Sequence, residues 1–552
     1  MHTAEGGGVN TAPLLPSARL VGGSSKNSQS VLRSNVANEL IFAVVGHVGS
    51  GTSEVCRFLQ AELESTSLPG GPYTVRILKA SNVIRSWAEG TGKEAPAKSQ
   101  KPLLRHAIAL QDLGDAMRRG GDHAAVAKKL VDEIRKARSS MLNVPASTDA
   151  DVLPDGTRRA YILDSIRHPT EVFLLRSLYQ AAFALVGVVC DEETRRQRLT
   201  HKFADAGDEG AQGFMARDNS AKEKHGQRVE GAFHLADYFL DNSVPRTGRD
   251  GKSNTDWKVS EHLSRLIKIV LHVEIIRPLS SETALYVASG AERRSACLSR
   301  QVGAALLDRE GNVIATGTNE VPKAGGGVYG QGFEEEGGKG KEKEAPDDRC
   351  FHSRKECSNT VEQKAIVDEL VELLALIPGM KESVTAQRQA LVDMLRESRI
   401  GGLLEFSRAV HAEMDALLSA ARKGISAVGT RMFVTTFPCH YCARHIVTAG
   451  VDEVQYIEAY PKSRALTLHN DSITDRVEGW KPPSSGEKDA KVLFRPFTGV
   501  APRLYSRAFM KDRELKDKNT GKLLVGEPAW GGPWDLGRLS YIQLENELLK
   551  TE

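Results

Sequence analysis

A short pattern of metal-ligand residues between His411 and Cys442 constrains this chain more than any other feature. The pattern reads His-Ala-Glu from His411 and Pro-Cys-His-Tyr-Cys from Pro438. The imidazole and the thiolates of Cys439 and Cys442 can hold Zn²⁺ through three protein ligands, which leaves the fourth tetrahedral position open to water. Bound zinc lowers the pKa of that water towards neutrality, and the carboxylate of Glu413 can move its proton. The pattern therefore predicts a catalytic zinc centre with Glu413 as its acid/base residue.

The surrounding residues predict two helices whose first turns carry these ligands. Apolar side chains recur at helical spacing after His411, and Gly424 marks a natural end of that helix. Residues 431–436 read as a strand, and a second short helix is expected over residues 442–450. Helix N-termini favour thiolates because the helix dipole is positive there. A structural zinc or a redox Cys-x-x-Cys pair is the alternative, but a structural site would need a fourth protein ligand and would not need Glu413.

Length and composition narrow the class of protein. At 552 residues the chain is long enough for two to four domains, and its hydrophobic content of 40% suffices for packed cores. The net charge of +3 is too small to indicate that the chain as a whole binds nucleic acid. Seven cysteines, two of them in the metal pattern, imply no disulfide framework. Because the chain lacks a long apolar run and a signal-peptide core, we expect a cytoplasmic protein without a membrane segment.

The first part of the chain contains a glycine-rich loop between a strand and a helix. Residues 1–36 are rich in Gly, Ser and Asn, which predicts a disordered leader. A buried-strand pattern over residues 39–45 precedes the loop, and a helix-like stretch over residues 54–63 follows it. In this arrangement backbone N–H groups and a helix N-terminus can bind phosphate. The candidate nucleotide-binding residues are Gly46, Gly49, Gly51, Thr52, Ser53 and, at the end of a second strand, Asp164.

Residues 37–270 resemble the P-loop nucleoside and nucleotide kinases through this loop, the segment 164–169 and an Ala-Asp-Tyr segment from Ala236. The resemblance implies a parallel sheet covered by helices. Thr52 stands where these kinases have their phosphate-loop lysine, so the loop lacks the main cation for the β- and γ-phosphates. Ser53 could still meet Mg²⁺. Nucleotide binding is therefore favoured over phosphoryl transfer, and a module that senses a ligand or builds an assembly interface is the alternative.

A second α/β region precedes the metal pattern. A helix is expected over residues 281–298, and strands over residues 301–308 and 313–317. This order resembles the zinc deaminases of the cytidine and deoxycytidylate group, which implies a three-layer α/β/α fold. In that group an Asn ahead of a Pro contacts the substrate, and Asn319 occupies that position.

An insertion over residues 323–402 interrupts this region. It opens with a Gly-, Glu- and Lys-rich stretch that we expect to be a mobile loop near the substrate, and it contains two helical stretches. Cys350, His352 and Cys357 form a Cys-x-His-x₄-Cys cluster, which could bind a second, structural zinc if another ligand comes from elsewhere. The alternative is three unrelated side chains in a loop.

The segment after the metal pattern adds further candidates. Tyr456 could stack on a base, as could Tyr460, although tyrosine in a strand is more often part of the core. Lys462 lies in a basic stretch that would suit a phosphate-bearing substrate, although a solvated surface explains it almost as well. The candidate substrate-binding residues are Asn319, Ala412, Tyr460 and Lys462.

The whole arrangement over residues 38–510 resembles the bacterial antiphage deoxycytidylate deaminases. The segments that carry the resemblance are His-Ala-Glu from His411, Phe-Pro-Cys-His-Tyr-Cys from Phe437 and Tyr-Pro-Lys-Ser from Tyr460. It implies zinc-dependent deamination of dCTP and dCMP to dUTP and dUMP, which depletes the pool that a replicating phage needs. It also implies a homo-oligomer and, in some members, an inhibitory small RNA as partner.

The predicted domain order has four parts: a leader (1–36), a degenerate P-loop kinase-like domain (37–270), a zinc deaminase domain (271–510) and a polar, Gly-rich tail (511–552). Two other functions stay open. The same zinc chemistry could serve a nucleic-acid cytosine or adenosine editor, but the near-neutral charge and the lack of an Arg/Lys stripe count against it. The chain could also be a nucleotide- or RNA-sensing regulator with a deaminase output. The sequence does not separate dCTP from dCMP as the preferred substrate.

Overall fold

The computed structural model describes residues 37–523, with gaps at residues 66, 69, 98, 100, 146–151, 220–224, 249–250, 331–346 and 511–515. The predicted leader, the Gly-, Glu- and Lys-rich stretch of the insertion and most of the predicted tail therefore lie outside the described residues. No helix within the described part of the chain is long and apolar enough to cross a membrane.

The described chain forms two compact units. The N-terminal unit comprises residues 37–278 together with residues 498–523, and the C-terminal unit comprises residues 279–497. Residues 498–510, which the sequence analysis places in the deaminase domain, therefore pack with the N-terminal unit. The reason is a strand pairing: Gly499 and Val500 pair antiparallel with Phe239 and Tyr238.

The N-terminal unit is built on a six-stranded sheet in the order β12-β5-β4-β1-β3-β2. Neighbouring strands are parallel except for the β12–β5 pair. Strands β1, β3 and β4 are buried along their whole length, as the apolar run over residues 39–45 predicts for β1. The strands are β1 (Glu39–Val45), β2 (Thr74–Lys79), β3 (Arg159–Asp164), β4 (Phe183–Val189), β5 (Tyr238–Asp241) and β12 (Gly499–Val500). The α-helices are α2 (Thr52–Leu63), α3 (Ala80–Gly90), α4 (Leu104–Arg118), α5 (Ala125–Leu142), α6 (Pro169–Tyr179), α7 (Glu192–Lys202), α8 (Asp208–Asn219), α9 (Val229–Phe233), α10 (Val259–Leu271) and α18 (Pro502–Ala508).

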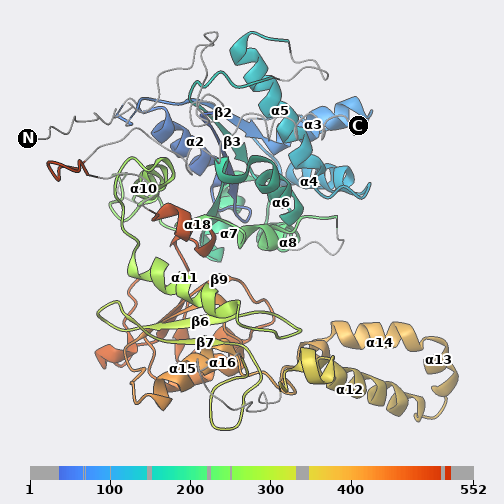
Figure 1. The fold of residues 1–552 in the computed structure, drawn as a ribbon. Coiled ribbons are helices and arrows are strands. Elements are labelled where there is room, and N and C mark those ends of the chain that lie inside the picture. Colours follow the sequence, from blue (N-terminus) through green and yellow to red (C-terminus); the bar gives the residue numbers. More distant parts are fainter. Residues whose placement is uncertain are drawn as a thin grey trace, which may run out of the picture. The chain divides into compact units, whose positions relative to one another are not determined.

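The C-terminal unit contains a second six-stranded sheet, in the order β10-β11-β9-β8-β6-β7. The hairpin β6–β7 and the β6–β8 pair are antiparallel, whereas β8, β9, β11 and β10 run parallel. Helix α11 lies on one side of this sheet and helices α15 and α16 on the other, which gives the predicted three-layer α/β/α architecture (Figure 1). The strands are β6 (Gly303–Leu307), β7 (Val313–Thr318), β8 (Arg431–Thr436), β9 (Glu453–Glu458), β10 (Ile473–Thr474) and β11 (Val492–Pro496). The α-helices that pack on the sheet are α11 (Ser280–Glu292), α15 (Ala412–Arg422), α16 (His440–Thr448) and α17 (Ala465–Leu468).

Helix α11 is shorter than the sequence predicts, because it ends at Glu292 rather than at residue 298. Side chains hold the following loop in another conformation: the Ser295 hydroxyl donates to the carbonyl of Asn319 at 2.7 Å. The Glu320 carboxylate accepts from the N–H of Ala296 at 2.8 Å. The loop is thereby tied to the end of β7 and leaves the helical path.

The insertion contains the π-helical turn η2 (Cys350–Arg354) and the helices α12 (Ser358–Ala375), α13 (Lys381–Ala386) and α14 (Arg388–Glu397). Within the C-terminal unit these helices project away from the sheet (Figure 1). The second predicted helix is divided in two at Gln387, which ends α13 and begins α14.

A buried ion pair secures the start of β1 in the N-terminal unit. The Arg138 guanidinium of α5 lies 2.7 Å from the Glu39 carboxylate, and both side chains are fully buried. The Tyr161 hydroxyl donates to the same carboxylate at 3.3 Å. A buried charge of this kind is tolerated only when it is paired and hydrogen-bonded.

Arg138→Ala should destabilise the N-terminal unit, because it leaves the Glu39 carboxylate buried without its closest cation. We expect the free energy of unfolding to fall by about 3–5 kcal/mol, the usual cost of removing one partner of a buried ion pair. Arg196→Ala removes ion pairs of similar length on the exposed face of α7 and should leave stability near that of the wild type. Denaturant unfolding followed by circular dichroism measures both variants, and equal losses would contradict the assignment.

Candidate active site

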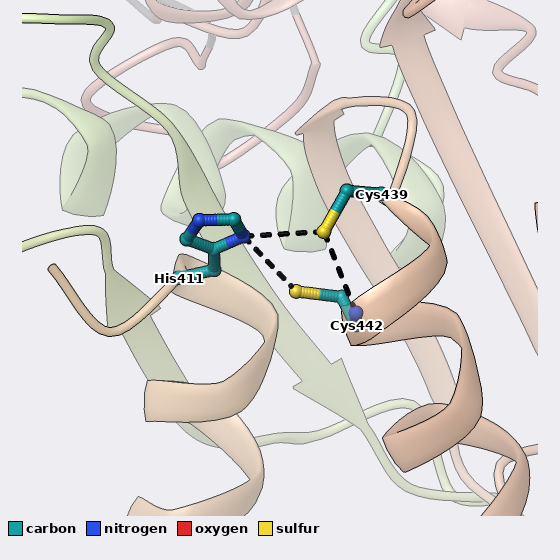
Figure 2. A group of neighbouring side chains, drawn as sticks. All are labelled: His411, Cys439 and Cys442. Atoms are coloured by element: carbon teal, nitrogen blue, oxygen red, sulfur yellow. Dashed lines mark hydrogen bonds between the residues drawn. The ribbon is translucent and has the colours of Figure 1, made fainter. Parts of the chain in front are cut away.

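The three predicted metal ligands lie together in the C-terminal unit, as Figure 2 shows. His411 is the N-cap of α15, Cys439 is the N-cap of α16, and Cys442 lies in the first turn of α16. The His411 Nδ1 atom is 3.3 Å from the Cys439 sulfur and 3.4 Å from the Cys442 sulfur. Within the described residues this is the one group of three or more metal-ligand side chains whose donor atoms all lie within 4.8 Å of one another.

The donor set fits Zn²⁺. One imidazole nitrogen and two sulfurs are the ligand types of catalytic zinc sites, and all three approach from helix N-termini, where the dipole favours thiolates. The hydrogen bond with Cys442 is the largest factor that lowers the pKa of the Cys439 thiol, to about 4, and the His411 contact adds to it. Burial alone would lower the pKa of His411, but the hydrogen bond and charge of Cys439 outweigh it and raise that pKa to about 9. Because zinc needs thiolates and a neutral imidazole, metal binding releases protons from this cluster.

Glu413 lies beside the metal ligands in the first turn of α15 and is almost completely buried. Burial is the main cause that raises the pKa of its carboxyl group, to about 7, and the charge of Cys439 adds to the shift. A carboxyl group here can hold or release a proton within the site, which is the property that a general acid/base requires.

The strand β8 and its neighbour β9 position the cysteine loop. The Phe437 N–H donates to the Glu458 carbonyl at 2.7 Å, and the Thr436 hydroxyl donates to the Glu458 carboxylate at 3.0 Å. The Ser463 hydroxyl donates to the Pro438 carbonyl at 2.7 Å, which ties the segment after β9 to the same loop. The Tyr460–Ser463 stretch therefore lies next to the metal cluster.

Asn319 is buried at the end of β7, and its amide binds backbone groups of the preceding loop. Its Oδ1 accepts from the Val302 N–H at 2.6 Å, and its Nδ2 donates to the Arg300 carbonyl at 2.6 Å. Through these bonds Asn319 holds the loop before β6 in place. A contact between Asn319 and the substrate stays a prediction.

The other predicted substrate residues are spread around the cluster. Ala412 is fully buried and begins α15, while Tyr460 is half-buried against the core that contains the ligands. Lys462 is exposed, and its ammonium donates to the Gly401 carbonyl of the insertion at 3.3 Å. Tyr456 packs edge-on against Phe437 with ring centroids 4.8 Å apart, and burial raises its pKa, which suits the core role.

Sequence reasoning missed Arg300, which precedes β6 and lies near the site only in the folded chain. Its guanidinium is 3.4 Å from the Glu458 carboxylate and stands over the Tyr460 ring, 5.6 Å from the centroid. A basic residue in a loop carries no sequence signal of its own. The pairing across β6, β8 and β9 brings it to the cysteine loop.

The predicted P-loop residues gather at the carboxyl ends of β1 and β3 in the N-terminal unit. Gly49 and Gly51 have φ near +85°, the left-handed conformation that favours glycine. The Ser53 hydroxyl donates to the Asp164 carboxylate at 2.7 Å, and Thr52 takes the first helical position of α2. Gly46 follows β1 at the start of the same loop.

A carboxylate contacts this loop from α8. The Asp218 carboxylate accepts from the Val48 N–H at 2.8 Å and pairs with Arg167 at 2.7 Å. Burial raises the pKa of Asp218, although the charge of Arg167 opposes the shift. One of the backbone donors of the loop is thus already bound to an anionic group of the protein itself.

Cys350 and Cys357 line one cavity of the C-terminal unit, and His352 is not among the residues that line it. The His352 ring is exposed, and its Nδ1 lies 3.0 Å from the Asp347 carbonyl. A second metal bound by these three side chains stays a prediction.

Comparison with known proteins identifies the same region. Residues 280–458 match the family model "Cytidine and deoxycytidylate deaminase zinc-binding region". The chain is 28% identical over 188 residues to the deoxycytidylate deaminase of Enterobacteria phage T4, covering 34% of this chain and 81% of the phage protein. It is 39% identical over 54 residues to ComE operon protein 2 of Bacillus subtilis (strain 168), covering 10% of this chain and 29% of that protein. The crystal structure of the dCMP deaminase from cyanophage S-TIM5 in apo form is 17% identical with a TM-score of 0.21, covering 40% of this chain and all of that one.

Gly317 of β7 sets the position of α15 and hence of His411. A Cβ added at Gly317 would overlap the Ala412 carbonyl oxygen and the Ala416 nitrogen, so only glycine allows this close packing. Gly317→Ala should lower the stability of the C-terminal unit by about 1–3 kcal/mol or more, the usual cost of overpacking. Gly290→Ala on α11 meets nothing within 4 Å and serves as the control. Thermal unfolding compares them, and an unchanged melting temperature for Gly317→Ala would contradict the packing argument.

The ligand cluster, the buried carboxyl group and the family match all fall in the same unit. Residues 280–458 are thus similar to the cytidine and deoxycytidylate deaminase zinc-binding region, and the chain is an enzyme of the hydrolytic deaminase class that acts on a C–N bond.

Proposed function

We propose that the C-terminal unit deaminates free deoxycytidine nucleotides, converting dCMP or dCTP to dUMP or dUTP and ammonia in a zinc-dependent reaction. The single observation that carries the proposal is the buried carboxyl group of Glu413 beside a His/Cys/Cys cluster with three protein ligands. The similarity to proteins described as deoxycytidylate deaminases supports the choice of substrate class.

His411, Cys439 and Cys442 would hold the zinc, which when bound supplies an activated water next to the substrate ring. Glu413 would act as the acid/base residue: its carboxyl group would hold a proton within the site and deliver it to the ring nitrogen and to the amine that leaves. Its burial among the ligands keeps bulk water from competing for these protons. Cys442 contacts Glu413 and thereby helps to orient the carboxyl group.

We propose that basic side chains at the edge of the site recognise the phosphate of the nucleotide. Arg300 and Lys462 both lie next to elements that hold the cysteine loop, the first through Glu458 and the second through the Tyr460–Ser463 stretch. A guanidinium binds phosphate in a bidentate manner, so Arg300 is the stronger candidate. Asn319 would support it by fixing the Arg300 backbone, and Tyr460 would line the pocket.

Glu413→Gln should lower kcat for dCMP by about 10²–10⁴-fold, the typical contribution of a general acid/base, while the bound zinc stays unchanged. Uracil formation and metal content would be measured on the same preparation. Glu397→Gln, on the exposed surface of α14, is the matched control and should behave as the wild type. A Glu413→Gln variant with wild-type turnover would refute the mechanism.

A substrate panel tests the substrate class. The zinc-loaded protein would be offered dCMP, dCTP, CMP, CTP and a cytosine-containing oligonucleotide. We expect uracil product from the free deoxynucleotides alone. Product from the oligonucleotide alone would instead establish a nucleic-acid editor.

The proposed biological role rests on the resemblance to the bacterial antiphage deoxycytidylate deaminases. We propose that the activity depletes deoxycytidine nucleotides during phage infection, in a cytoplasmic homo-oligomer that a small RNA can inhibit. The P-loop of the N-terminal unit would bind a regulatory nucleotide rather than transfer phosphate, because Thr52 replaces the lysine and Asp218 already contacts the loop. Phage plaque counts on cells that express the wild type or Glu413→Gln test the defence role; equal counts would reject it.

A further inference from the structure

The end of α8 contacts the loop between β1 and α2 (residues 46–51) through two consecutive side chains. The Asp218 carboxylate accepts from the Val48 N–H at 2.8 Å. The Asn219 Oδ1 atom lies 2.8 Å from the His47 Nε2 atom. Burial is the main cause that lowers the pKa of His47, to about 4, so its ring is neutral at pH 7 and donates to Asn219. Side chains of α8 therefore bind two adjacent residues of the loop.

The Asp218 carboxylate binds groups of the kind that bind phosphate. Its side chain is completely buried and pairs with the Arg167 guanidinium at 2.7 Å. The same guanidinium nitrogen donates to the Gly46 carbonyl at 3.0 Å, so Arg167 lies at the start of the loop. Backbone N–H groups before a helix and guanidinium groups are common ligands of phosphate oxygens. Asp218 thus makes two interactions that a phosphate group could make here.

Two buried polar atoms beside the loop lack a hydrogen-bond partner among the described residues. One is the Oγ atom of Ser50, which lies 2.5 Å from the position that a Cβ of Gly46 would take, inside the loop. The other is the Nε atom of Arg195 on α7, whose backbone packs against Gly49. Buried polar atoms without partners are uncommon in folded proteins and often indicate that an ion or another polar group binds there.

A small apolar cluster and a pair of salt bridges hold α8 over the loop. Val48 packs with Phe214 of α8 and with apolar side chains of α4 and α7 in this cluster. Arg217 pairs with Asp112 and Asp115 of α4 at 2.6 and 2.9 Å. Elements held by few apolar contacts and partly exposed ion pairs open at lower cost than the main core. We therefore expect α8 to leave the loop while the sheet stays folded.

We propose that Asp218 occupies a phosphate position of the loop, and that the phosphate chain of a nucleotide displaces it and binds there. The inference rests on the regulatory nucleotide proposed above. When Asp218 leaves, the Val48 N–H and the Arg167 guanidinium become available to phosphate oxygens, with the Ser50 hydroxyl beside them. Arg167 supplies the positive charge that Thr52, in place of lysine, does not supply.

This competition sets the apparent affinity for the nucleotide. A ligand that binds only the open form of a protein binds more weakly in proportion to the fraction of molecules that are open. Removing the negative charge of Asp218 weakens its hold on Arg167 and on the loop, so it increases that fraction. The nucleotide and Asp218 compete for the same groups, so a weaker contact of Asp218 strengthens nucleotide binding.

Isothermal titration calorimetry of the full-length protein with Mg²⁺–ATP and with Mg²⁺–tripolyphosphate tests the proposal. D218N keeps the side-chain volume but removes the charge, and we expect it to lower the Kd by about tenfold or more. Arg217→Ala loosens α8 without a change in the loop and should lower the Kd by about two- to fivefold, as expected for partly exposed ion pairs. Adding Arg167→Gln to D218N should abolish the gain. D208N, at the exposed start of α8, is the control and should leave the Kd unchanged.

The two probes separate the sources of the phosphate chain. A gain in affinity for both probes assigns the displacement to the phosphate chain alone, whereas a gain for ATP alone assigns it to a nucleotide. Hydrogen–deuterium exchange shows where the change occurs. When Mg²⁺–ATP binds to the wild type, we expect faster exchange over residues 214–219, while the loop stays protected.

Equal affinities of the wild type, D218N and Arg217→Ala would overturn the displacement and leave nucleotide binding itself standing. A ligand that protects the loop without faster exchange of α8 would do the same. If D218N fails to fold, Arg217→Ala and the exchange of the wild type still decide. Absence of binding by every form would reject the regulatory nucleotide as well, and dCMP turnover tests the deaminase assignment separately.

Discussion

The approach of two helix N-termini to one point is the constraint on which the C-terminal unit depends. His411 is the N-cap of α15 and Cys439 is the N-cap of α16, so the donor atoms meet only if both helices start at the same edge of the sheet. The parallel strands β8 and β9 carry the cysteine loop to that edge, and Gly317 lets α15 pack directly on β7. Helix dipoles then favour the thiolates, so the electrostatics of the site follow from the packing.

Burial gives this cluster its chemistry. Desolvation favours the neutral form of Glu413, while hydrogen bonding favours the thiolate form of Cys439, and the two groups lie within the same core. Proton transfer within a site needs neighbouring groups that differ in proton affinity, and Glu413 and Cys439 differ in this way. The same core contains apolar side chains of β6, β8 and β11, so the stability of the sheet and the state of the site are linked.

In the N-terminal unit, the side chains around the glycine-containing loop bear on the predicted nucleotide binding. The loop joins β1 to α2, and the Ser53 hydroxyl donates to the Asp164 carboxylate. Thr52 takes the first helical position of α2, and the buried Asp218 carboxylate accepts from the backbone N–H of Val48 in the loop. A fold alone does not determine function. Thr52 and Asp218 therefore count against phosphoryl transfer more strongly than the loop counts for it.

The sequence by itself determined the elements whose signals are local. The spacing of His411 and the two cysteines predicted the cluster that the three side chains form, because first turns of helices repeat the same geometry wherever they occur. The apolar run over residues 39–45 likewise predicted β1. The tertiary structure alone decided what depends on contacts between distant segments: Arg300 beside Glu458, Cys297 in the cavity that Cys350 also lines, and β12 on the sheet of the N-terminal unit. Such pairs produce no periodic pattern in the sequence, because they depend on the strand order of the whole sheet. The early end of α11 has the same cause, because hydrogen bonds to Asn319 and Glu320 override the helical preference of residues 293–298.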